Sequence, residues 1–162
     1  NTANRYDGLR YTGEFSYMGL SSYESNSPSL LAFERWNLGW IEDSQIECMK
    51  SPQLTKLISP VEITGGTKAI IIPISRTKAV VIESRRAIGI DKALNKSGAL
   101  VYIVDSSIQS GQGPVKVFPS DLINDPRFLN APRALGESVT VEGVTIKVVK
   151  SDSMGDTVEI NK

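Results

Sequence analysis

The C-terminal part of the chain shows strict alternation of apolar and polar positions. From residue 144 to residue 148, Val and Ile alternate with Thr and Lys, which is typical of a strand with one buried and one exposed face. Glu142-Gly143 separates this run from the short β-rich run at 138–141. The pattern therefore predicts a β-hairpin, followed by a last strand at 157–160 after the turn at 152–155.

Short runs rich in branched residues, separated by turn residues, occupy most of the chain from residue 56 onwards. The predicted strands are Lys56–Thr64, Lys68–Ile74, Lys78–Arg85, Ala99–Asp105, Val115–Phe118, Ser138–Val141, Val144–Val149 and Thr157–Ile160. The run Ala69–Ile72 is apolar throughout, which predicts a central strand with both faces covered, and Pro73 places its end at an edge or bulge. No helical pattern long enough for parallel crossovers separates these runs, so we expect a mainly β protein, an antiparallel β-sandwich.

The N-terminal part differs from the rest. Residues 1–26 are rich in Gly, Tyr, Ser and Asn and keep no period, so we expect an irregular segment that orders only against a larger surface. Ser27-Pro28 is a helix-start pattern and Gly39 a helix-stop residue, which predicts one short helix over 29–38. Its apolar stripe, which we expect to be buried, consists of Leu30, Phe33, Trp36 and Trp40.

Composition excludes several classes of function. The chain has 162 residues, 18 Lys+Arg against 18 Asp+Glu, and no apolar run long enough to cross a bilayer, so nothing favours nucleic acid or a membrane span. It has no histidine and one cysteine, Cys48, which rules out His-dependent nucleophilic catalysis and a His- or Cys-rich zinc site within these residues. We expect Cys48 to be a small buried hydrophobic residue, with an intermolecular disulfide as the alternative.

Carboxylates are the remaining common catalytic groups. Glu83 lies in a strongly apolar predicted strand, with Arg85 two residues later on the same face. A buried Glu beside an Arg is more often a structural ion pair than a catalytic acid, and we interpret Glu83 and Arg85 in that way. A weak calcium site in the Asp-containing loops stays open, whereas a carboxylate-dependent glycosidase has little support because no two acids are suitably placed.

Two blocks of sequence resemble one known family. The first is Phe15-Ser16-Tyr17-Met18-Gly19, followed by Leu31-Ala32-Phe33-Glu34-Arg35-Trp36-Asn37-Leu38-Gly39-Trp40. The second comprises Val81-Ile82-Glu83-Ser84-Arg85, Gly89-Ile90-Asp91, the run 97–105 and Leu135-Gly136-Glu137-Ser138. Together they resemble the methionine-turn segment and the following β-rich region of immune inhibitor A-like secreted zinc metallopeptidases, although Phe15-Ser16 departs from the aromatic-Asp pair usual before the turn.

The resemblance carries expectations for individual parts of the chain. Met18 matches the methionine that packs beneath the zinc without ligating it, whereas the zinc-binding helix would lie upstream of Asn1. Residues 1–40 would then be the tail of a protease domain and residues 41–162 a β-sandwich domain. The resemblance implies an extracellular protein whose partners are the N-terminal catalytic half and a protein or peptide substrate, with zinc held by the parent protein.

Two functional hypotheses follow. The leading one is a non-catalytic C-terminal portion of such a peptidase, with no hydrolytic activity and no zinc affinity of its own. The alternative is an extracellular β-sandwich that serves as a binding or structural assembly module without enzymatic activity, using its sheet edges for association.

Overall fold

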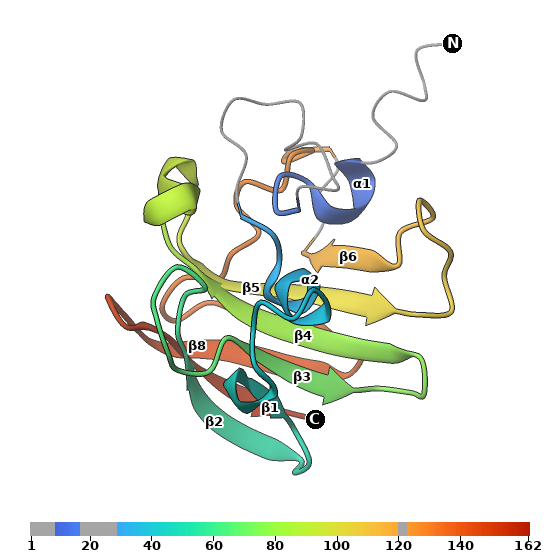
Figure 1. The fold of residues 1–162 in the computed structure, drawn as a ribbon, viewed down its shortest axis with the longest axis horizontal. Helices are drawn as coiled ribbons and strands as arrows, with labels where there is room; N and C mark the ends of the chain where they lie inside the picture. The colour runs from blue at the N-terminus through green and yellow to red at the C-terminus, as the bar shows by residue number, and fades with distance from the viewer. Residues whose placement is uncertain (1–8, 17–28, 120–122) are drawn as a thin grey trace.

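The protein folds as two β-sheets packed face to face, with a helical layer on the outer face of one sheet (Figure 1). The computed structural model describes residues 9–16, 29–119 and 123–162. Sheet A has the strand order β1-β3-β4-β5-β6, and sheet B has the order β2-β9-β8-β7. A β-sandwich, as the sequence predicts, is confirmed.

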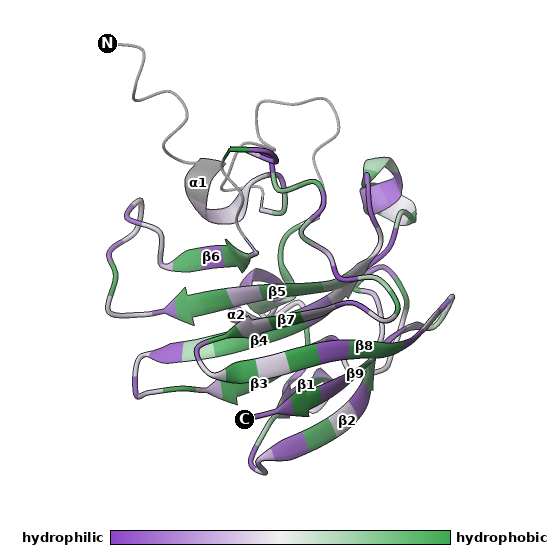
Figure 2. Cartoon of the chain, turned by 180° about the vertical axis from the view of Figure 1, so that it is seen from behind, coloured by the Kyte–Doolittle hydropathy of each residue, from purple (hydrophilic) through white to green (hydrophobic). Residues whose placement is uncertain are grey.

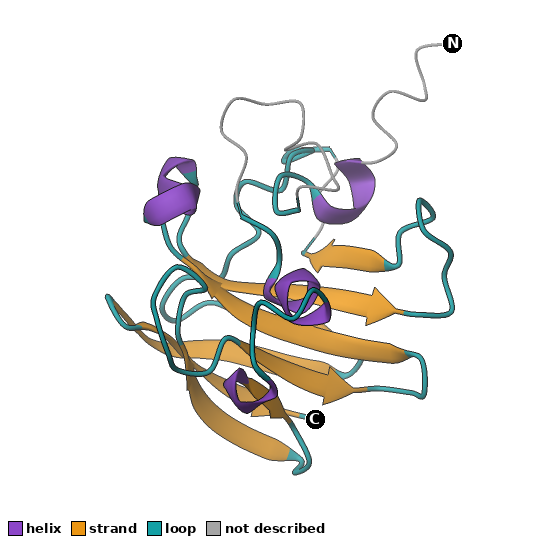
Figure 3. Ribbon diagram, in the orientation of Figure 1, coloured by secondary structure: helices purple, strands orange, loops and turns teal. Residues whose placement is uncertain are grey.

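Strands make up most of the regular structure, and the helices are short (Figure 3). Sheet A contains β1 (Ile46–Cys48), β3 (Ala69–Pro73), β4 (Lys78–Arg85), β5 (Gly98–Asp105) and β6 (Val115–Phe118). Sheet B contains β2 (Gln53–Ile58), β7 (Ser138–Val141), β8 (Val144–Asp152) and β9 (Gly155–Asn161). The helical segments are α1 (Leu9–Thr12), α2 (Ala32–Asn37) and the 3₁₀ turns η2 (Asp43–Gln45) and η3 (Gly89–Ala93).

Strand pairing is antiparallel except at one edge of sheet A. There β1 runs parallel to β3, with Ile46 opposite Ala69 and Cys48 opposite Ile71. The sequence did not predict β1, because three residues are too few to show a period. The hairpin turn between β7 and β8 agrees with the prediction, since Glu142 (φ 51°) and Gly143 (φ 77°) both adopt the positive φ that a type I′ turn needs.

Two apolar clusters lie on opposite faces of sheet A. The first fills the space between the sheets, and the alternation along β8 that builds part of it is visible in Figure 2. The second lies between the outer face of sheet A and the segments at 9–16, 29–41 and 128–131. Strand β3 therefore has both faces covered, as predicted: Ile70 and Ile72 belong to the first cluster, and Ala69 to the second.

The outer layer corrects one expectation about the N-terminal segment. The catalytic half that the resemblance implies would be the larger surface that residues 1–26 need, but within this segment Phe15 is 1% exposed and packs in the second cluster. The backbone N–H of Glu14 donates to the carbonyl oxygen of Arg127 at 3.1 Å. The larger surface that this segment requires is the chain's own sheet A.

Several local predictions were also wrong. The predicted strand Lys56–Thr64 is β2, which ends at Ile58, because Pro60 lacks an N–H group and a turn follows it. Cys48 is exposed rather than buried, since it lies on the edge strand β1. Trp40 is 67% exposed, because α2 ends at Asn37 and the apolar stripe ends with it.

No helix in the described part of the chain combines the length and the apolarity that crossing a membrane would require.

Candidate functional site: a buried ionic cluster that holds residues 29–33

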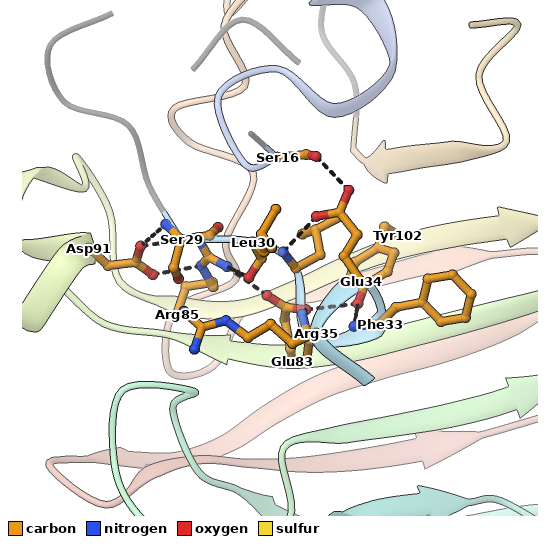
Figure 4. Close-up of polar contacts among 12 residues, drawn as sticks. Ser16, Ser29, Leu30, Phe33, Glu34, Arg35, Glu83, Arg85, Asp91 and Tyr102 are labelled. Atoms are coloured by element: carbon orange, nitrogen blue, oxygen red, sulfur yellow. Dashed lines mark hydrogen bonds and ion pairs between the residues drawn. The ribbon is translucent and has the colours of Figure 1, made fainter. Parts of the chain in front are cut away.

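Four buried polar side chains meet beneath the segment that leads into α2 (Figure 4). Glu83 and Arg85 come from β4 and Tyr102 from β5, all on the outer face of sheet A, and Asp91 comes from η3. We call these four residues the Arg85 cluster. Residues two apart on a strand share a face, which places Glu83 and Arg85 side by side as the sequence predicted.

Arg85 is the centre of the cluster and is fully buried. Its Nη1 lies 2.9 Å from Glu83 Oε1, and its Nε lies 2.9 Å from Asp91 Oδ2. The same guanidinium donates to two main-chain carbonyl oxygens, those of Ser29 at 3.0 Å and Leu30 at 3.3 Å. Its planar group of donors is therefore shared between two carboxylates and the backbone.

Glu83 and Tyr102 bind the next part of the same segment. Glu83 Oε2 accepts the backbone N–H of Ala32 at 2.7 Å and the hydroxyl of Tyr102 at 2.8 Å. The Tyr102 hydroxyl in turn accepts the backbone N–H of Phe33 at 3.2 Å. Asp91 Oδ1 accepts the backbone N–H of Ser29 at 2.6 Å.

The cluster thus recognises main-chain atoms over residues 29–33, in the way that a neighbouring strand would. These contacts satisfy backbone groups at the start of a six-residue helix, which have no intrahelical partners. Glu34 contributes from α2 itself, since its Oε2 accepts the N–H of Leu31 and its Oε1 accepts the hydroxyl of Ser16. The segments on both sides of residues 17–28 are therefore joined to each other and to sheet A.

Burial perturbs the titration of every member. It raises the pKa of Glu83 and of Asp91 above their ordinary values, although the Arg85 guanidinium opposes this effect. Burial alone would lower the pKa of Arg85, but the adjacent Glu83 and Asp91 carboxylates outweigh it and raise that pKa. The pKa of Tyr102 is well above its usual value because of burial and the Glu83 charge.

A second buried polar group connects the two sheets. Asp156 at the start of β9 accepts the Ser84 hydroxyl at 2.6 Å and the Ser151 hydroxyl at 2.7 Å. Arg86 donates to the same carboxylate at 2.8 Å and to the carbonyl oxygen of Gly155 at 2.8 Å. Ser84 lies on the opposite face of β4 from Glu83 and Arg85, and Arg86 follows directly after the strand, so neighbouring residues at this end of β4 hold the outer layer and the second sheet.

The geometry of the Arg85 cluster favours a positioning role over chemistry on a substrate. Glu83 and Arg85 have no exposed area and Asp91 is 1% exposed, so neither water nor a substrate reaches them. Within the described ranges, no three His, Cys, Asp or Glu residues converge in a way that could hold a metal ion.

Of the three site residues that the sequence predicts, the structure describes two. The contact between Glu83 and Arg85 is present, whereas Met18 lies outside the described residues. Sequence reasoning missed Asp91 as a partner of Arg85 and missed Tyr102 altogether, because only the folded chain brings η3 and β5 to β4. A Tyr within the apolar strand β5 was the one available signal, since a buried phenol usually needs a hydrogen-bond partner.

Comparison of the chain with protein-family models, with curated protein sequences and with solved structures finds no significant match.

Proposed function

We propose that this chain is the non-catalytic C-terminal portion of a secreted zinc metallopeptidase of the immune inhibitor A type. In that role the sandwich holds the methionine-turn segment beneath the zinc site of an upstream catalytic half. The protein would act outside the cell on protein or peptide substrates. The proposal rests on the sequence blocks described above and on one structural observation.

That observation is the anchoring of the chain on both sides of Met18. Phe15 on one side and Leu31 on the other are buried in the same apolar cluster against sheet A. The Arg85 cluster adds hydrogen bonds and ion pairs to residues 29–33. A turn that supports a metal site has to be held at both ends, because small displacements of supporting residues reduce catalytic efficiency.

The part of the chain that the structure describes brings together no donor set for zinc. The sequence contains no histidine and one cysteine, and the described residues bring no three suitable side chains together. The zinc ligands and the general base would therefore come from the upstream half.

A second candidate function is an extracellular binding or structural module without enzymatic activity. The packing of residues 9–16 on the chain's own sheet favours it, because this part of the N-terminal segment needs no other protein to cover it. Under this alternative the sandwich would work without an upstream catalytic half.

The test is to express the product of the complete reading frame and to measure casein hydrolysis with and without a chelator. We expect an upstream His-Glu-x-x-His motif and chelator-sensitive hydrolysis, which replacement of the motif's Glu abolishes. Residues 1–162 expressed alone serve as the matched control and should hydrolyse nothing and bind no stoichiometric zinc. Hydrolysis by residues 1–162 alone would contradict the proposal, and a reading frame without such a motif would favour the module.

A further inference from the structure

A tryptophan lies at the rim of a polar cleft on the outer layer. Trp40 is 67% exposed, which is unusual for the largest apolar side chain in a folded domain. The adjoining cleft has a volume of about 220 Å³ and a mostly polar wall. Its lining includes Arg35, Trp40, Gln45, Glu62 and Lys68.

The end of α2 holds the backbone of Trp40 in a fixed place. The N–H of Gly39 donates to Trp36 O at 2.9 Å, and the N–H of Trp40 donates to Arg35 O at 2.8 Å. With Gly39 at φ 72°, this is the hydrogen-bond pattern of a Schellman motif. The exposed indole is therefore attached to an ordered helix end. Ligand binding at the indole costs little conformational entropy of the main chain, because the main chain is already ordered there.

Hydrogen-bonding groups remain available beside the indole. Gln45 uses its side-chain carbonyl oxygen to accept the N–H of Glu42 at 3.2 Å, and its amide nitrogen has no hydrogen bond to any residue that the structure describes. Glu62 Oε1 accepts Arg35 Nη2 at 3.1 Å, and its Oε2 lies close to Gly89 without a hydrogen bond to any residue that the structure describes. The cleft thus offers free donors and a free acceptor, each on a planar group.

The charged groups of the cleft already have partners within the chain, which restricts the class of ligand. Arg35 and Glu62 form an ion pair. The ammonium group of Lys68 is directed to the carbonyl oxygens of Pro60 and Ile63. A strongly charged ligand would have to break these pairs, and a purely apolar one would leave buried polar groups without partners.

We propose that the cleft beside Trp40 binds a neutral saccharide. A sugar ring has an apolar C–H face that can stack on the indole and hydroxyl groups that both donate and accept hydrogen bonds. Gln45 would donate to one hydroxyl, and Glu62 would accept from another. The lining of this cleft shares no residue with the Arg85 cluster, and the saccharide proposal does not depend on the peptidase proposal.

The test is calorimetric titration of residues 1–162 with the hexasaccharides of chitin, cellulose, xylan and starch. We expect saturable binding of at least one of them with a Kd at or below about 1 mM, which is a weak but specific range. Trp40→Ala should weaken this binding by about tenfold or more, since an aromatic anchor carries much of the energy at such sites. Leu38→Ala is the matched control, because Leu38 is 55% exposed on the same segment and does not line the cleft.

Either of two results would overturn the saccharide proposal, and a third would contradict the role of Trp40. One is the absence of binding to all four hexasaccharides at concentrations of about 5 mM, well above the expected Kd. The other is equal affinity in the wild type and Trp40→Ala, with unchanged unfolding curves for both proteins. Loss of binding in Leu38→Ala as well would show a general disturbance of the helix end and would also contradict the assignment to Trp40.

Discussion

Replacing Arg85 by Met should destabilise the protein severely. Met keeps an unbranched aliphatic stem like that of Arg but has no guanidinium. The contacts to Glu83 and Asp91 and to the carbonyl oxygens of Ser29 and Leu30 are therefore lost. Two carboxylates would then remain buried without a cation. Breaking a buried ion pair from one side costs about 3–5 kcal/mol, a large share of the roughly 5–15 kcal/mol that stabilises a typical domain.

Urea unfolding at neutral pH, followed by circular dichroism and tryptophan fluorescence, measures this loss. We expect the fluorescence to change with it, because Trp36 belongs to α2 and packs against the cluster that the outer layer forms with sheet A. Glu83→Gln combined with Arg85→Met should recover part of the loss, because one unpaired charge disappears with it.

The matched control is Lys96→Met, which removes an ion pair to Glu137 at 2.7 Å in which both side chains are partly exposed. Surface pairs of this kind contribute about 1 kcal/mol or less. If Arg85→Met costs no more than Lys96→Met, the view that the Arg85 cluster holds the outer layer is refuted.

Three further predictions concern pH dependence, a close backbone approach and an exposed thiol. Burial raises the pKa of Glu83 above its ordinary value of 4.5, so the folded state binds a proton at Glu83 more tightly than the unfolded chain does. The contribution of protonated Glu83 to the free energy of unfolding is therefore complete below pH 4.5, and it is lost as pH rises through the raised pKa. Urea unfolding between about pH 4 and about pH 7 should show a smaller fall of stability with pH in Glu83→Gln than in the wild type, and an equal fall would contradict the assignment. Gly155→Ala should lower the free energy of unfolding, measured by thermal unfolding, by more than about 1 kcal/mol, since φ is +134° and a Cβ would overlap the carbonyl oxygen of Ile58. The control, Gly136→Ala, has φ +84° with open space around it and should lower this free energy by less. Cys48 should react with a thiol reagent such as DTNB in the native protein, and reaction only after addition of urea would show that it is not exposed.

Local patterns predicted the parts of the fold that depend on neighbouring residues. Strand β4 begins and ends as its apolar run predicts, and the β7–β8 hairpin follows from alternation on both sides of Glu142-Gly143. Strand β1 escaped prediction because its parallel pairing with β3 depends on a contact between distant segments rather than on its own three residues. The exposure of Trp40 has a similar cause, since a helix-spaced stripe gives no information on how far the covering sheet extends.

The candidate site, too, could be predicted only where it depends on residues close together in the sequence. Glu83 and Arg85 are two residues apart on one strand, so their contact could be predicted from the sequence. Asp91 reaches Arg85 only because η3 folds back over the end of β4, and Tyr102 reaches Glu83 only because of the β4–β5 register. The burial of Phe15 was missed because the sequence does not reveal which face of sheet A the N-terminal segment covers.

Recognition of residues 29–33 through main-chain atoms has a consequence for how the protein can evolve. The N–H groups of Ser29, Ala32 and Phe33 are all donated to side chains of the sandwich, so proline is excluded at these three positions. Leu30 contributes only its carbonyl oxygen to these contacts, so packing alone limits the side chain at that position. Among descendants of this chain, residue 30 can therefore vary among apolar side chains, whereas a change at one residue of the Arg85 cluster leaves the others buried with fewer partners.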